Sequence, residues 1–389
     1  MQIIKRKFFP LSILLLLAVV LSACATGAMP DRSWPESLVD GETIYLVNHS
    51  YVYAVDISRF VENDKAHEHA GFGDKEKLRY PKEPEGSTNF GSAPVKLGDN
   101  LVLTDYSGNI RTISSSVDGN ATKDISKMSN ASGRFLSSAT VAGDLILAAN
   151  ADHKLYAYDK DLNEVKWTFD GATDGIWTKP VVVGDMIFVA SIDRNVYAIR
   201  QNAKGDGYEK VWTDNAGGPV FFSLTADEDG NLYVGTLNNE LISYNAKTGE
   251  RNWTVTTSGT VWSPVVVKGD RIFGGDQSGK IFSLKKSDGS TVWDFNVMSP
   301  VIGSVALDDT TVYAGTFDGK AICLSIEDKS DDRETCTKKV GGKLLSTPVF
   351  AGDYIVFGVV DGDKLLAGFK VANMTNETDK PDWTFNPSK

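Results

Sequence analysis

One pattern recurs eight times along the chain: a strand, a Gly-Asp-type turn, a second strand, another Asp- or Gly-rich turn, and a third apolar strand. The copies follow one another at roughly the 40–50-residue spacing that is typical of repeat architectures. Aligned on the first turn, they are marked by Gly41, Gly98, Gly143, Gly184, Gly230, Gly269, Asp309 and Gly352. Such a repeat constrains the whole fold, because each unit can bury its apolar faces only against its neighbours.

The copy at residues 261–295 indicates what each unit is. Its β-branched and aromatic runs predict four strands, at Trp262–Val267, Arg271–Gly275, Lys280–Leu284 and Thr291–Phe295. Tight turns separate these strands, and Gly279 can adopt the positive φ that one of the turns requires. Eight such units predict an all-β fold, an eight-bladed β-propeller of four-stranded antiparallel blades over residues 34–389.

Residues 1–23 have the features of a targeting segment. Three basic residues at positions 5–7 precede an apolar run at Leu11–Leu21, which is too short to span a membrane. The segment ends in Leu-Ser-Ala-Cys24, which resembles the bacterial lipobox, in which the cysteine is lipidated and becomes the new N-terminus. We therefore expect a lipoprotein signal peptide, a lipidated Cys24 and a flexible tether at residues 24–33. Ordinary signal cleavage beside an incidental Cys24 is the alternative.

The charge balance limits the classes of partner. The formal net charge is −11, and removal of the basic targeting segment makes the mature chain more acidic still. An acidic body is a poor ligand for nucleic acid or anionic lipid headgroups. We expect no nucleic-acid partner, and contact with the membrane through the lipid anchor only. The acidity is in keeping with a soluble body in an extracytoplasmic space.

Blades one and two depart from the pattern. Residues 60–89 form a polar insertion that is longer than the equivalent connection elsewhere, and residues 114–132 predict an irregular outer edge in blade two. The insertion contains His67-Glu68-His69, which suggests a metal site. Two histidines with no further spaced ligand, on a stretch without strand or helix periodicity, favour a solvated loop instead.

From blade three onward the repeat is regular, and in most of these blades the fourth strand carries tryptophan. Residues 244–253 and 284–293, which end in Trp253 and Trp293, resemble the tryptophan-docking repeat of the pyrroloquinoline quinone (PQQ)-like β-propellers. A large indole on the outer strand can fill the wedge that opens between splayed blades, and its N–H can bond a carbonyl of the neighbouring blade. We therefore interpret these tryptophans as structural.

A second recurring position lies seven or eight residues before each first turn, where the chain approaches the innermost strand. It is apolar in every copy, as Trp34, Phe90, Leu136, Trp177, Phe222, Trp262, Ile302 and Leu345. Such a ring of side chains either packs between the inner strands or forms a docking surface around the mouth of the central channel. On the second interpretation, Trp177, Phe222 and Trp262 are the expected partner-binding anchors.

Enzymatic motifs are missing from the sequence. The catalytic PQQ-like propellers carry calcium-ligating carboxylates and often an adjacent pair of cysteines against the quinone, whereas no two of the three cysteines here, Cys24, Cys323 and Cys336, are adjacent. No haem-attachment, P-loop, zinc-protease or serine-hydrolase motif occurs. We therefore expect no cofactor, no metal and no catalytic residues, with a PQQ-dependent dehydrogenase as a minor alternative.

Taken together, these features describe a lipid-anchored PQQ-like propeller without cofactor motifs. It is similar to the BamB family, lipoproteins of the outer-membrane β-barrel assembly machinery. The resemblance implies a monomeric, non-catalytic scaffold that holds envelope protein partners, anchored to the cell membrane or the outer membrane. No local motif transfers the family's partner contacts to residues of this chain. A surface lipoprotein that binds small ligands or glycans through an aromatic rim is the alternative.

Cys323 and Cys336 are predicted to form a disulfide. Cys323 takes the small-residue slot of the third strand, and Cys336 takes the slot that holds tryptophan in other blades. The two residues therefore fall on neighbouring antiparallel strands, where opposed Cβ atoms come within bridging distance. An exported protein meets an oxidising compartment, which favours the bond. Two buried free thiols are the alternative.

Overall fold

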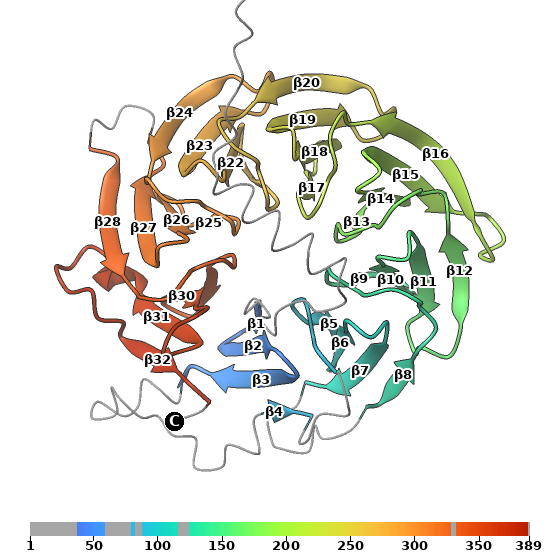
Figure 1. Ribbon diagram of the computed structural model, residues 1–389, viewed down its shortest axis with the longest axis horizontal. Helices are drawn as coiled ribbons and strands as arrows, with labels where there is room; N and C mark the ends of the chain where they lie inside the picture. Colours follow the sequence, from blue (N-terminus) through green and yellow to red (C-terminus); the bar gives the residue numbers. More distant parts are fainter. Residues whose placement is uncertain (1–36, 59–78, 82–87, 116–123, 328–331, 388–389) are drawn as a thin grey trace, which may run out of the picture. The chain divides into compact units, whose positions relative to one another are not determined.

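The chain folds into a ring of eight β-sheets. The computed structural model describes residues 37–58, 79–81, 88–115, 124–327 and 332–387, all within the compact unit Trp34–Lys389. In this part of the chain each sheet has four antiparallel strands that are consecutive in sequence, and the first strand of each sheet lies nearest the centre of the ring (Figure 1). The predicted eight-bladed, all-β fold is confirmed. The predicted signal peptide, Cys24, the tether and His67-Glu68-His69 lie outside the described residues.

Blades one to four differ most in their outermost strands, which are short in blades one and two and longest in blade four. Their strands are β1 Ser37–Asp40, β2 Thr43–Asn48, β3 Tyr51–Asp56 and β4 Arg79–Tyr80; β5 Val95–Leu97, β6 Asn100–Thr104, β7 Ile110–Ser114 and β8 Ser126–Met128; β9 Thr140–Ala142, β10 Leu145–Ala149, β11 Leu155–Asp159 and β12 Val165–Phe169; and β13 Val181–Val183, β14 Met186–Ala190, β15 Asn195–Gln201 and β16 Tyr208–Asn215.

Blades five to eight are more uniform, and a 3-10 turn, η2 (Val371–Asn373), follows the third strand of blade eight. Their strands are β17 Leu224–Ala226, β18 Asn231–Thr236, β19 Glu240–Asn245 and β20 Arg251–Thr256; β21 Val266–Lys268, β22 Arg271–Gly275, β23 Lys280–Lys285 and β24 Thr291–Asn296; β25 Ala306–Leu307, β26 Thr311–Gly315, β27 Lys320–Ser325 and β28 Glu334–Lys339; and β29 Val349–Ala351, β30 Tyr354–Gly358, β31 Leu366–Lys370 and β32 Trp383–Phe385.

The core consists of apolar layers between adjacent blades. Successive residues of a strand point to opposite faces of the sheet, so each sheet contributes to two layers. In blade six, Ile272 and Phe282 pack towards blade five, whereas Phe273 and Ile281 pack towards blade seven. The alternation of apolar residues on the middle strands, which the sequence displays, therefore leaves neither face of a blade open.

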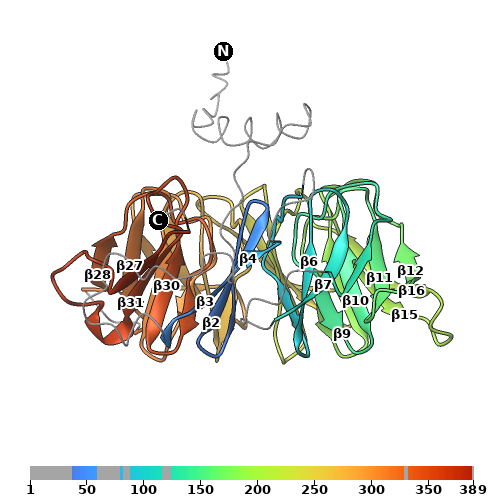
Figure 2. The same ribbon diagram turned by 90° about the horizontal axis from the view of Figure 1, so that it is seen from below.

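The first and last blades close the ring through apolar packing. Ile44 and Leu46 of blade one share an apolar cluster with Val356 and Phe385 of blade eight, and the innermost strands β1 and β29 lie side by side. No strand is exchanged between the two blades in the described part of the chain. Figure 2 shows the strands running between the two faces of the ring.

A small residue on the third strand faces each tryptophan of the fourth strand. Ser243 lies opposite Trp253, whose Nε1 donates a hydrogen bond to the carbonyl of Lys286 in the next blade at 3.0 Å. A Cβ built on Gly289 of that blade would lie 2.8 Å from the indole, so the close approach requires glycine there. The equivalent pairs are Ala157–Trp167, Ala198–Trp212, Ser283–Trp293 and Gly368–Trp383. The indoles thus fill the wedge between blades, as the sequence predicted.

Cys323 and Cys336 occupy the matching positions of blade seven. The register of β27 and β28 places them directly opposite each other, with their Cα atoms 4.9 Å apart and their sulfur atoms bonded. Both side chains lie in the apolar layer between blades seven and eight. A disulfide therefore stands where other blades have a small residue and a docked tryptophan.

Two strand predictions need correction. The strand predicted at Trp262–Val267 begins only at Val266, because the preceding segment, which contains Pro264, bonds to its neighbours instead. The carbonyl of Pro264 accepts a hydrogen bond from Ser304 of the next blade, and that of Val265 accepts one from Thr225 of the preceding blade. The region predicted as an irregular outer edge of blade two contains a true fourth strand, β8.

Candidate functional site

Blades four to six carry an aromatic cluster at their inner ends. Trp177, Phe221 and Trp262 lie shortly before the innermost strands β13, β17 and β21. The ring centroids of Trp177 and Phe221 are 4.8 Å apart, and those of Phe221 and Trp262 are 5.2 Å apart. The ring centroid of Phe222 is 6.3 Å from that of Trp177 and 6.2 Å from that of Trp262, so this ring lies near both tryptophans. The three residues that the sequence predicted as anchors are thus brought together around Phe221.

Phe221, rather than Phe222, holds the position equivalent to Trp177. The N–H of Ile176 donates to the carbonyl of Asn150 at the end of the preceding blade's second strand, and the N–H of Val220 donates to Ser191 in the same way. The residues that follow these two donors are therefore equivalent. Counting back from Gly230 misplaces the position, because the first turn of blade five is longer than the others.

Most side chains of this aromatic cluster are buried. Trp177 and Trp262 are each only 6% exposed, and Phe221 is buried as well. The indole N–H of Trp262 is buried without a hydrogen-bond partner. Leu136, at the equivalent position of blade three, is also buried. Packing therefore accounts for the recurring apolar position, and the half-buried Phe222 is the predicted anchor through which the cluster meets solvent.

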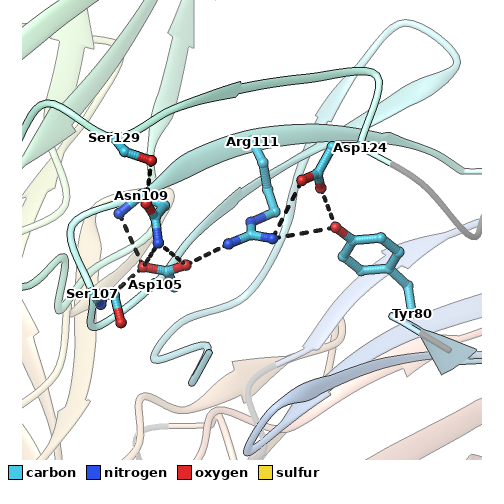
Figure 3. A network of polar contacts seen from close by, with 7 residues as sticks. All are labelled: Tyr80, Asp105, Ser107, Asn109, Arg111, Asp124 and Ser129. Carbon is cyan, nitrogen blue, oxygen red and sulfur yellow. Dashed lines mark hydrogen bonds and ion pairs between the residues drawn. The ribbon is translucent and has the colours of Figure 1, made fainter. Parts of the chain in front are cut away.

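A buried polar network joins blades one and two (Figure 3). Arg111 on β7 forms an ion pair with Asp105 at 2.6 Å and lies 3.5 Å from Asp124. Its guanidinium also contacts the hydroxyl of Tyr80 on β4 at 3.4 Å, and that hydroxyl donates a hydrogen bond to Asp124. Asp105 also accepts hydrogen bonds from the backbone N–H groups of Ser107 and Asn109 at 2.9 Å each.

The electrostatics of this network favour a structural role. Burial, and then the hydrogen bond with Asp124, raise the pKa of Tyr80 above its ordinary value, so the phenol stays protonated at neutral pH. The Arg111 charge is balanced by the two carboxylates, and its side chain is only 3% exposed. The charged groups of this network are paired with one another, although the buried Nε of Arg111 has no hydrogen-bond partner in the described part of the chain. We interpret this network as a structural link between blades one and two.

A shallow pocket of about 500 Å³ lies between blades five and six. Its lining is polar and includes no aromatic residue: Asn231, Asn252, Asp270, Lys285, Lys286 and Ser287. Several of these groups are already paired. The amide of Asn252 donates to Asn231 at 3.0 Å, and Lys286 forms ion pairs with Asp229 and Asp227. Across the described ranges, no group of three or more metal-ligating side chains was found, and no helix is long and apolar enough to cross a membrane.

Eight four-stranded blades, of which several dock a tryptophan of the fourth strand against the next blade, define a PQQ-like β-propeller. The sequence matches the model of the family described as "Outer membrane protein assembly factor BamB" over residues 111–207, 204–327 and 277–386. The chain belongs to this family. No curated protein matches it closely.

Two solved structures have the same fold. The crystal structure of BamB from Moraxella catarrhalis is 14% identical, with a TM-score of 0.64 over 84% of this chain and 94% of that one. The computationally designed Ika8 protein is 10% identical, with a TM-score of 0.69 over 88% of this chain and 97% of that one. At these identities the likeness extends to the fold alone.

Proposed function

We propose that this protein is a lipid-anchored, extracytoplasmic scaffold that binds envelope protein partners and catalyses no reaction. Membership of a family named for outer-membrane protein assembly is the observation that carries the proposal. The Leu-Ser-Ala-Cys24 ending of the targeting segment supports attachment through an acyl anchor. Assembly of outer-membrane proteins is the cellular process that we infer for it.

The ring is suited to binding a protein surface. Its apolar layers hold each blade against two neighbours, so the turns on either face present side chains at little cost in conformational entropy. Phe222 is the contact residue that we favour, because its ring is half-buried and rests on Trp177 and Trp262. A rigid aromatic side chain on a packed base is typical of binding hot spots.

The glycan-binding alternative has less support. Sugar recognition uses an open aromatic face beside polar groups, but Trp177 and Trp262 are each 6% exposed, and the polar pocket of blades five and six lacks aromatic residues. A PQQ-dependent dehydrogenase is the other alternative, and the spacing of Cys323 and Cys336 offers no adjacent pair to hold a quinone.

Co-purification from native membranes tests the proposal. The solubilised lipoprotein should retain a defined set of envelope proteins, and the Phe222→Ala variant should lose at least part of that set while melting close to the wild type. Substituting the buried tryptophans is less informative, since each Trp→Ala change in a packed layer costs about 3–5 kcal/mol. Reduction of a dye by the purified protein with PQQ, calcium and an alcohol or sugar would instead establish an enzyme.

A further inference from the structure

The rim of the ring is formed by the fourth strand of each blade (Figure 1). In the described part of the chain, each of these outer strands pairs with the third strand of its own blade and with no strand beyond it. The outer side of an edge strand presents backbone N–H and C=O groups with which an extended segment of another polypeptide can pair. The geometry of the outer strands therefore decides whether the rim can take up such segments.

An extra residue interrupts the outer strands of blades three to seven. In blade four, Ala198 pairs with Trp212 and the next residue, Ile199, pairs with Lys210, so that Val211 is left unpaired in a β-bulge. The same register shift occurs in β12, β20, β24 and β28, directly before the residue that docks in the wedge. The unpaired residues there are Lys166, Asn252, Val292 and Thr335. A bulge disrupts the hydrogen-bond ladder and increases the local twist of the strand.

The bulges leave only short regular edges. The longest uninterrupted stretches of these outer strands have four residues, as in Trp212–Asn215 and Trp253–Thr256. Strands in globular proteins commonly have about five or six residues. An incoming strand therefore meets an edge on which few main-chain hydrogen bonds can form in one register.

The bulges follow the length of the outer strand and not the docking of tryptophan. Blade eight docks Trp383 opposite Gly368 without a register shift, and its outer strand β32 has only 3 residues. Blade seven keeps the bulge although Cys336 stands in place of tryptophan. The outer strands without a bulge in blades one and two have 2 and 3 residues, whereas the bulged strands have 5 to 8. Docking an indole therefore does not require a bulge, which points to a second role for it.

Side chains hold two of the bulges in place. The hydroxyl of Thr335 donates a hydrogen bond to the carbonyl of Cys323 on the third strand at 3.3 Å. The amide of Asn252 donates to the hydroxyl of Ser243 at 3.1 Å, also on the third strand of its own blade. These contacts tie the unpaired residue to the sheet, so the irregular edge is a fixed part of the blade.

We propose that the rim of this ring is protected against strand addition, by a bulge where the outer strand is long and by its short length elsewhere. Bulges and very short edge strands are two of the features by which natural sheets avoid edge-to-edge pairing. Extended segments of other polypeptides then do not pair with the rim. The inference goes beyond the proposed scaffold function, because it implies that a partner is held by side chains, as at Phe222, and not by main-chain pairing with an outer strand.

A strand peptide tests the proposal on the solubilised, purified full-length protein. The labelled peptide copies β15 (Asn195–Gln201), the natural neighbour of β16; fluorescence anisotropy measures binding, and hydrogen exchange locates it. Deletion of Val211 gives β16 a regular edge and removes a side chain that is 39% exposed, so a gain in binding comes from the backbone. We expect the deletion to tighten binding roughly tenfold or more and to protect β16 amides, because several more main-chain hydrogen bonds can form.

Val211→Ala is the matched control, because it loses most of the same side chain but keeps the bulge, and it should bind the peptide as weakly as the wild type. If the Val211 deletion melts well below the wild type, deletion of Asn252 repeats the test in blade five. Protection of outer-strand amides by the peptide in the wild type would overturn the proposal, whether or not either deletion folds. So would a folded deletion variant that binds no better than Val211→Ala. No envelope partner enters this test, so its outcome is separate from that of the scaffold function.

Discussion

Arg111 and Asp105 form an ion pair inside the ring, with 2.6 Å between Nη2 and Oδ2 and with 3% and 0% of their side chains exposed. Arg111 occupies the place on β7 that Tyr156 holds on β11 and Tyr197 on β15. Blade one has no tryptophan in its fourth strand, β4, to dock onto blade two. The buried charges, with Tyr80 on β4, thus connect blades one and two where the tryptophan dock is missing.

Arg111→Met should destabilise the protein by about 3–5 kcal/mol, because it leaves the charge of Asp105 buried without its partner. Denaturant unfolding measures the change. The exposed pair Lys280–Asp294 provides the control, since Lys280→Met should cost less than about 1 kcal/mol. The double variant Arg111→Met, Asp105→Asn should recover part of the loss. If Arg111→Met lowers the free energy of unfolding no more than the control does, the structural role of the Arg111–Asp105 pair is contradicted.

The Cys323–Cys336 pair should resist alkylation in unfolded protein that has not been reduced, and should gain two labels after reduction. The bond closes a short loop, with a sequence separation of 13, so its loss should cost roughly 2–3 kcal/mol. The double variant Cys323→Ala, Cys336→Ala should show this cost in denaturant unfolding. Two thiols that react before reduction would mean that the cysteines are free in the cell.

Cys24→Ser should release the protein from the membrane fraction, because the predicted acyl anchor cannot form. Fractionation followed by immunoblotting measures the shift, and a high-salt wash removes protein held by charge alone. Ser22→Thr, which leaves the cysteine intact, is the matched control. A Cys24→Ser protein that stays bound after the wash would place the anchor elsewhere.

Stability should fall in acid partly through Asp227. Burial raises the pKa of this carboxyl, but hydrogen bonds from Asn231 and Tyr233, together with the charge of Lys286, outweigh burial, so its pKa lies below the ordinary value. A carboxyl with a lowered folded-state pKa stabilises the fold above its unfolded pKa, and this contribution is lost as pH falls through the folded value.

Asp227→Asn should therefore be less stable than the wild type at neutral pH. The difference in the free energy of unfolding between the two proteins should narrow below about pH 4, near the ordinary carboxyl pKa. Denaturant unfolding at several pH values gives the comparison. Asp270→Asn, at an exposed turn whose carboxylate is 95% exposed, serves as the control. A stability difference between Asp227→Asn and the wild type that stays constant with pH would exclude a contribution from the titration of Asp227.

The repeat in the sequence was sufficient to predict the number of blades. Glycine or aspartate at eight first turns, together with period-two apolar strands, leaves a ring as the arrangement that covers both faces of every sheet. The docked tryptophans were predictable for the same reason. A small residue such as Ser243 and a tryptophan such as Trp253 recur at the same two positions in five of the blades. Local pattern and global packing agree at these positions.

Counting along the chain failed where a turn changed length. The spacing places Phe222 at the aromatic position that Phe221 holds, because the longer first turn of blade five shifts the count without changing the hydrogen bond of the Val220 N–H. Backbone pairing with the preceding blade decides the position, and a single sequence does not display that pairing. The shortened first strand of blade six has the same origin, since the carbonyl of Pro264 bonds across blades.

The amino-acid sequence by itself determined the eightfold repeat, the docked tryptophans and the slots of Cys323 and Cys336, because these depend on residue type at a fixed spacing. Only the tertiary structure decided which side chains meet solvent. Burial depends on neighbours from other blades, so Trp177 and Trp262 lie inside a packed layer while Met298 stands exposed on a strained turn. The Arg111–Asp105 pair likewise forms because the fold places both groups in one space that water does not reach.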